Sequence, residues 1–102
     1  MNNWERMKAG RLYNADSKDL EKYHSFGMET CDKFNRTPLW RKKRKQRLLE
    51  KLIPSAKDGG AAIFAPFYCE YGVNIHFGKG CFVNYKCTFL DCAPITLEDG
   101  VW

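Results

Sequence analysis

Residues 70–102, EYGVNIHFGKGCFVNYKCTFLDCAPITLEDGVW, decide the fold of this chain, because apolar side chains recur in them at every sixth position. The period starts slightly earlier, and one of its columns holds Ala65, Tyr71, Phe77, Val83 and Phe89. A second column, offset by four residues, holds Cys69, Ile75, Cys81 and Cys87. After Cys92 the period slips by two residues and then resumes at Leu97. Both columns are apolar throughout, which predicts that both face a core.

The position after the first column carries Gly72, Gly78 and Asn84, which favour turns. Hexads that combine two inward apolar positions with a turn are typical of a parallel β-helix, in which three hexads make one triangular coil. We therefore predict an α+β fold in which residues 61–102 form the first coils of a left-handed parallel β-helix. The alternative is an antiparallel meander with accidental spacing, which a hairpin at residues 75–90 would reveal.

Residues 1–60 are predicted to form a helical segment of three helices. Asn3 and Asp16 are placed to cap the first two helices, and Thr37 followed by Pro38 predicts the start of the third. A turn at residues 57–60 ends this segment. Apolar residues at helical spacing are expected to pack together and against the first coil. They are Trp4, Met7, Leu20, Tyr23, Leu48, Leu52 and Ile53. In the second predicted helix, Leu20, Tyr23, Cys31 and Phe34 form an apolar stripe with a gap at Gly27.

The net charge of +5 is concentrated in residues 36–47, at and just before the third predicted helix. Seven cations lie there without an acid between them: Arg36, Arg41, Lys42, Lys43, Arg44, Lys45 and Arg47. Leu39 and Trp40 open this helix, so we expect both of its ends to be buried and Lys42, Lys43 and Lys45 to lie in water. Binding of nucleic acid by this run is an alternative. The aromatic residues are mostly in the repeat, and none falls among the cations from Arg41 to Arg47 to stack on bases, so nucleic acid is not the expected partner.

The composition, 44% hydrophobic and 28% charged, is that of a soluble globular chain. Its longest apolar stretch, residues 61–69, is interrupted by Pro66 and is shorter than the roughly 20 residues that span a bilayer. The N-terminus does not have the pattern of a secretory signal. We therefore expect a cytoplasmic protein without membrane contact. The five cysteines lack the CxxC pairs of zinc sites, so we expect no metal and no disulfides, and cysteines that serve as small buried apolar residues.

Three stretches together resemble the maltose and galactoside O-acetyltransferases, a family of hexapeptide-repeat acyltransferases. Residues 7–20, MKAGRLYNADSKDL, are similar to the family's opening helix and turn, and residues 33–38, KFNRTP, to the end of its second helix. Residues 69–102 follow its YGxNIxxG coil, asparagine-centred hexad and leucine-aspartate turn. The resemblance implies a homotrimer with active sites between subunits, acetyl-CoA as cosubstrate and a sugar as acceptor. A histidine of the family acts as general base on the sugar hydroxyl.

The resemblance also assigns site residues. Asn84 matches the asparagine beside the acceptor and the catalytic histidine. Asp91, Glu70 and Asp16 match positions on the acceptor side. Each has a structural alternative, since Asn84 could be a turn residue, Asp91 could cap a turn and Glu70 could be a solvated acid.

The histidine-proline pair that carries the family's base has no counterpart among these residues. His24 is expected to be a surface or packing residue of a helix, and His76 lies outside both inward columns. We therefore expect the chain to be the N-terminal part of a sugar O-acetyltransferase, truncated before its base and inactive by itself. A solenoid without a terminal cap could instead be a non-catalytic assembly module, which is a second alternative.

Overall fold

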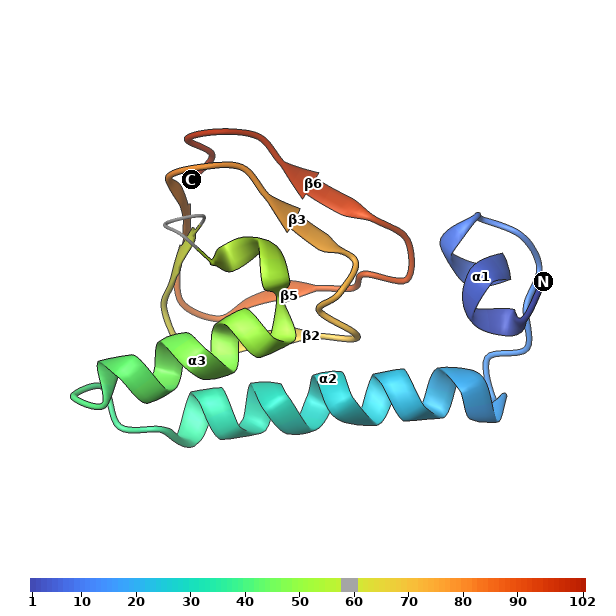
Figure 1. Cartoon of the computed structure of the whole chain (residues 1–102), viewed down its shortest axis with the longest axis horizontal. Coiled ribbons are helices and arrows are strands. Elements are labelled where there is room, and N and C mark those ends of the chain that lie inside the picture. Colours follow the sequence, from blue (N-terminus) through green and yellow to red (C-terminus); the bar gives the residue numbers. More distant parts are fainter. Residues whose placement is uncertain (58–60) are drawn as a thin grey trace.

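The structure, a computed structural model, describes residues 1–57 and 61–102. Its helices are α1 (Asn3–Lys8), α2 (Lys18–Arg36), α3 (Lys42–Leu52) and the 3₁₀ helix η1 (Pro54–Ala56). Its strands are β1 (Ala61–Ile63), β2 (Phe67–Cys69), β3 (Ile75–Phe77), β4 (Cys81–Val83), β5 (Cys87–Phe89) and β6 (Ile95–Leu97). The strands wind above α2 and α3 (Figure 1). Apart from residue 57, the predicted turn at 57–60 lies outside the described residues.

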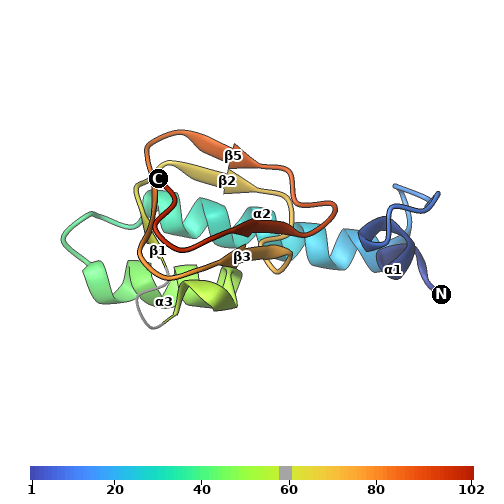
Figure 2. The same cartoon turned by 90° about the horizontal axis from the view of Figure 1, so that it is seen from above.

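The six strands pair only in parallel: β1 with β4, β2 with β5 and β3 with β6. Each residue pairs with the one 20 positions later, as Ala61 does with Cys81. The strands therefore form two stacked triangular coils, and β2 and β5 lie side by side when the molecule is seen from above (Figure 2). The predicted parallel coils are confirmed, and the antiparallel meander is wrong.

The coils turn at three corners, and each corner stacks on its counterpart 20 residues later. The first corner comprises residues 64–66 and 84–86, the second residues 70–74 and 90–94, and the third residues 78–80 and 98–100. The first and third corners take three residues per coil, whereas the second takes five. A coil is therefore 20 residues long instead of the 18 of three plain hexads.

The five-residue second corner corrects the predicted columns. The slip of two residues after Cys92 also occurs one coil earlier, between β2 and β3. The sequence did not reveal this earlier slip, because the apolar Tyr71 stands at the position expected for the inward column. As a result Ala65 and Tyr71 lie at corners and not in the inward columns, and Cys69 belongs to the column of Phe77.

The interior of the coils is filled by the first and third residues of each strand. Of the nine residues in the two predicted columns, Cys69, Ile75, Phe77, Cys81 and Val83 are buried inside the coils. Cys87 and Phe89 of the second coil are partly buried and pack against the same core. Burial therefore decreases from the first coil to the second at β5 and β6, whereas the inward residues of β4 stay buried.

The N-terminal helices cover the first coil in two separate clusters. The larger one joins the inward faces of α2 and α3 to the strands and includes Phe34, Leu52, Ile53 and, partly buried, Leu48. The smaller one contains Met7, Leu20 and Tyr71, with Trp4 packed against it. The Trp4 ring stacks on Tyr23 with 4.2 Å between centroids. The predicted helix residues therefore pack against the first coil, but in two clusters and not in one.

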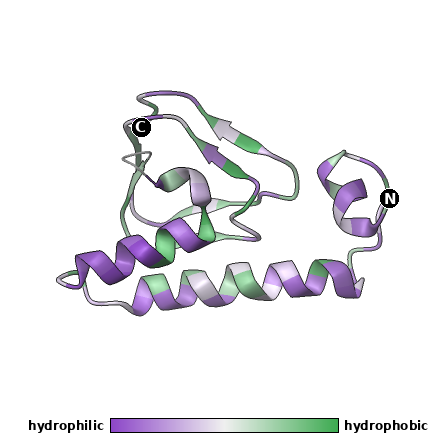
Figure 3. Cartoon of the chain, viewed as in Figure 1, coloured by the Kyte–Doolittle hydropathy of each residue, from purple (hydrophilic) through white to green (hydrophobic). Residues whose placement is uncertain are grey.

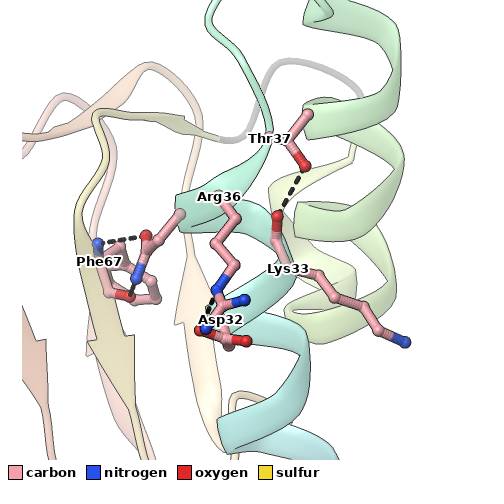
Figure 4. A network of polar contacts seen from close by, with 6 residues as sticks. Asp32, Lys33, Arg36, Thr37 and Phe67 are labelled. Atoms are coloured by element: carbon pink, nitrogen blue, oxygen red, sulfur yellow. Dashed lines mark hydrogen bonds and ion pairs between the residues drawn. The ribbon is translucent and has the colours of Figure 1, made fainter.

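Two polar side chains of the helices also bind the edge strands of the first coil. The Asn35 amide accepts from the Phe67 N–H at 2.8 Å and donates to the Phe67 carbonyl at 2.9 Å (Figure 4). The Ser55 hydroxyl accepts from the Phe77 N–H at 2.8 Å and donates to the Ile75 carbonyl at 3.1 Å. Because an unpaired strand edge invites pairing with other chains, these contacts make the helical segment a cap for the coil.

The caps of the first two helices differ from the prediction. Asn2, and not Asn3, caps α1 by accepting from the Glu5 N–H at 2.9 Å. Ser17, and not Asp16, precedes α2. The adjacent acid of α2, Asp19, accepts from the Trp4 N–H at 2.9 Å and ties α1 to α2.

The third helix begins later than predicted, at Lys42, because residues 38–40 form a turn. Thr37 ends α2 instead of starting α3, and its hydroxyl donates to the Lys33 carbonyl at 2.6 Å (Figure 4). Leu39 and Trp40 are 80% and 77% exposed, so the expected burial of this end is wrong.

Figure 3 shows that the first turns of α3, which carry the basic run, are hydrophilic. Lys42 and Lys43 are exposed as predicted, but Lys45 is partly buried. Its ammonium donates to the carbonyls of Phe34 at 3.2 Å and Thr37 at 3.3 Å, and desolvation lowers the pKa of Lys45. Lys45 therefore satisfies carbonyls at the C-terminal end of α2. None of the described helices is long and apolar enough to cross a membrane.

Candidate functional site

The predicted site residues lie at two different corners of the coils. Glu70 and Asp91 belong to the second corner, on successive coils, and Asn84 belongs to the first corner. Asp16 lies in the loop before α2 and lines a cleft beside the second corner. Asp16, Glu70 and Asp91 thus lie near the second corner but do not share a cavity, because Glu70 lines a separate groove between α2 and β2 and Asp91 is buried.

Asp91 is 0% exposed and holds the backbone of the second corner together. Its carboxylate accepts from the N–H groups of Tyr71 at 2.9 Å, Gly72 at 2.8 Å and Asn74 at 3.2 Å. Burial raises the pKa of Asp91, and these N–H donors oppose that rise. Within the chain, Asp91 therefore caps a turn, which was the structural alternative for this residue. Contact between Asp91 and a sugar acceptor stays a prediction.

Asn74 completes the same corner and was not singled out from the sequence. It is 1% exposed, and its amide donates to the Asp91 carbonyl at 2.8 Å. The backbone carbonyl of Asn74 accepts from the Ile95 N–H at 2.8 Å. The available signal was a polar residue just before the inward Ile75, at the place where the first slip of the period occurs.

Glu70 is partly exposed and contacts the coil above it. The Cys92 thiol donates to its carboxylate at 3.0 Å. Burial and the nearby Glu70 charge raise the pKa of Cys92 to about 11, so this thiol stays protonated as a donor at neutral pH. Tyr13 lies beside them, and its pKa is raised mainly by the neighbouring Cys92. Glu70 is thus an oriented carboxylate and not a freely rotating surface acid.

The cleft beside the second corner has a volume of about 320 Å³ and is lined by the end of the Asp16 loop and the first turns of α2. Its polar lining comes from Asp16, Glu21 and His24, and Tyr71 closes it on the coil side. The His24 and Tyr71 rings lie 5.6 Å apart between centroids. His24 therefore packs on the aromatic cluster, as expected, and also faces the cleft.

Asn84 is exposed at the first corner. Its Oδ1 atom accepts from the Tyr85 N–H at 2.8 Å, which fixes the side chain over the turn. Within the described residues its Nδ2 group has no partner, so this donor can bind a ligand. The adjacent Lys86 has a φ of 59°, in the region that favours glycine.

The second histidine, His76, lies on β3 opposite Thr96 and is exposed. It is on the face between the second and third corners and not beside Asn84. Across residues 1–57 and 61–102, no group of three or more histidine, cysteine or acidic side chains is arranged to hold a metal ion.

Comparison with known proteins identifies the helical cap. Residues 6–57 match the family described as the maltose acetyltransferase hexapeptide capping motif. This match spans α2, α3 and η1, which cover the first coil.

The chain is similar to nodulation protein L of Rhizobium leguminosarum bv. viciae, with 36% identity over 94% of this chain and 50% of that protein. It is also similar to the crystal structure of a maltose O-acetyltransferase from Clostridium difficile 630, with 31% identity, a TM-score of 0.90, and coverage of 97% of this chain and 52% of that one. A hexapeptide-repeat acetyltransferase from Vibrio cholerae, complexed with acetyl coenzyme A, matches with 26% identity, a TM-score of 0.74, and coverage of 94% and 51%. The chain thus spans about half the length of the relatives it matches.

Proposed function

Because the chain belongs to the family of the maltose acetyltransferase hexapeptide capping motif, we propose that it forms the cap and the first two coils of a cytoplasmic sugar O-acetyltransferase. The β-helix would be left-handed, and the enzyme would transfer acetyl from acetyl-CoA to a sugar hydroxyl. The observation that carries the proposal is the cap itself: the matched segment covers the first coil through Asn35, Ser55 and the inward faces of α2 and α3.

The division of the candidate residues between two corners supports a site shared by two subunits. A three-residue strand, roughly 10 Å long, separates the first corner from the second. Asn84 and the second-corner residues therefore do not face one another within a single chain. A ring of identical subunits can bring the first corner of one copy to the second corner of the next. We propose a homotrimer with this arrangement.

The chemistry requires a sugar hydroxyl to attack a thioester, and a hydroxyl is a weak nucleophile without a base. In the proposed site, the unpartnered Nδ2 group of Asn84 donates to the reacting groups. The carboxylates of Glu70 and Asp16 accept hydrogen bonds from other hydroxyls of the sugar. Asp91 acts as a positioning residue, since its bonds fix the backbone that follows Glu70. Acetyl-CoA supplies the acetyl group when bound.

The general base and the acetyl-CoA site are assigned to residues outside these 102. His76 projects from a different face, and His24 packs on Tyr71. We therefore propose that the 102-residue polypeptide alone has no acetyltransferase activity, because a missing base alone typically lowers a rate by about 10²- to 10⁴-fold.

The test joins the chain to the C-terminal half of the Clostridium difficile maltose O-acetyltransferase. We expect this fusion to acetylate a sugar such as maltose or glucose with acetyl-CoA, while the 102-residue polypeptide does not. Asn84→Ala should reduce the fusion's activity by at least about tenfold. Lys79→Ala, at the exposed third corner, is the matched control and should leave it unchanged.

A folded trimeric fusion without transferase activity would contradict the proposed function. Robust turnover by the 102-residue polypeptide would contradict the assignment of the base to other residues.

A further inference from the structure

Two buried thiols meet where the cap contacts the first coil. Cys31 of α2 and Cys69 of β2 are 3% and 6% exposed, and their Sγ atoms lie 3.5 Å apart. They are 38 positions apart in the sequence. Among the described cysteines, this is the one pair in direct contact. The Cys81 thiol donates to the Glu98 carbonyl at 3.2 Å, and the Cys92 thiol donates to Glu70.

The surrounding contacts hold the two thiols in register. One turn before Cys31, Gly27 lies so close to Glu70 that an added Cβ would overlap the Glu70 carbonyl oxygen. One turn after it, Asn35 makes its two hydrogen bonds to Phe67. Contacts at three successive turns of α2 thus fix its distance from β2, and Cys31 and Cys69 form the middle one.

The thiol pair lies at the base of an open groove of about 420 Å³ between α2 and the face formed by β2 and β5. Both cysteines line this groove, together with Met28, Tyr68 and Leu90. The groove therefore brings a reagent to the edge of the thiol pair, and because the two residues are 3% and 6% exposed, attack on the reagent requires a local opening between α2 and β2.

We propose that Cys31 and Cys69 form an oxidative modification site, in which a small disulfide such as glutathione disulfide converts the two thiols into a disulfide between the cap and the first coil. The Cys31 thiolate attacks one glutathione sulfur, forms a mixed disulfide and releases the first glutathione as a thiol. The Cys69 sulfur then attacks Cys31 and releases the second glutathione. The protein loses two electrons and two protons, and the two glutathiones carry them away.

The electrostatics of the pair favour this order. The hydrogen bond between the thiols lowers the pKa of Cys31, because the remaining S–H stabilises its thiolate. The same contact, together with burial, raises the pKa of Cys69. In a reducing compartment the pair is expected to be reduced, and it closes only under oxidising conditions.

Trypsin makes the test specific, because it is expected to cut the chain into peptides that separate the cysteines. Cys31 falls in residues 23–33, Cys69 in 58–79 and Cys81 in 80–86, while Cys87 and Cys92 share 87–102. After treatment of the 102-residue chain with excess glutathione disulfide, we expect a loss of about 2 Da and a cross-link between peptides 23–33 and 58–79. The melting temperature should rise by roughly 10 °C and fall again with dithiothreitol.

Cys31→Ser should abolish both the cross-link and the rise in melting temperature. Cys81→Ser, which removes a buried cysteine outside the pair, should keep both. If Cys31→Ser does not fold, the peptide map of the unsubstituted chain decides. The proposal is overturned by free thiols or stable glutathione adducts at Cys31 and Cys69 under saturating oxidant, or by a cross-link that joins other peptides.

Discussion

The first and second corners both connect successive strands of the coils, but they differ in burial and in hydrogen bonding. The second corner is built around the fully buried Asp91, whose carboxylate binds three backbone N–H groups. At the first corner, Asn84 is exposed, and its side-chain bond is to the next residue. The resemblance predicts an acceptor-side role for both residues, and of the two Asn84 alone presents an exposed polar group. A residue proposed for a site can therefore serve it either by contact or by support.

Substitutions at the two corners should differ most in their effect on stability. Asp91→Ala removes the acceptor of three buried N–H groups, so we expect the free energy of unfolding to fall by about 3 to 5 kcal/mol. Asn84→Ala should change it by less than about 0.5 kcal/mol, because the side chain is exposed. Urea unfolding followed by circular dichroism measures both values. Similar losses in the free energy of unfolding for the two variants would contradict the proposed difference between the corners.

A second variant tests whether helix α2 of the cap packs directly on the second corner. Gly27→Ala places a methyl group against the Glu70 carbonyl oxygen, so α2 must move away from the corner. We expect a loss of about 2 kcal/mol, although alanine is the better helix former by roughly 1 kcal/mol. Ser25→Ala, at an exposed position of the same helix, is the matched control and should be neutral or slightly stabilising. A stabilised Gly27→Ala chain would show that the close approach is absent in solution.

The smallest effect is a pH dependence of the second corner. Burial raises the pKa of Tyr71 from 10.0 to about 12, so the folded chain holds this proton more tightly than the unfolded chain does. The stabilisation is fully present below pH 10 and is lost as pH rises through 12. Between pH 9 and 11, the wild-type chain should lose about 1.3 kcal/mol relative to Tyr71→Phe.

The measurement compares free energies of unfolding of the two chains from pH 9 to 11. Tyr85→Phe, at the exposed first corner, is the matched control for removal of a tyrosine hydroxyl. A difference between wild type and Tyr71→Phe that stays constant over this range would contradict the burial of the phenol in solution.

The sequence predicted the coils because two inward positions per strand repeat along the chain, and it predicted the helical segment from its spacing. It placed the start of α3 incorrectly, because Thr37 and Pro38 fit a helix start locally while Thr37 in fact ends α2. It also missed the first five-residue corner, since Tyr71 is apolar but packs on Trp4 and not in the coil. The roles of Asn35 and Asn74 depend on contacts across the fold, which no local pattern contains.

A site shared by the first corner of one subunit and the second-corner side of the next can be tested by mixing two inactive variants of the fusion enzyme. Asn84→Ala damages the first corner, and Asp16→Ala damages the acceptor side near the second. When the two proteins are unfolded, mixed in equal amounts and refolded, random trimers should contain about one intact site in four and recover about a quarter of the wild-type acetyltransferase activity. Each variant refolded alone should remain inactive. Mixed trimers that show no more activity than the separate variants would contradict a site between subunits.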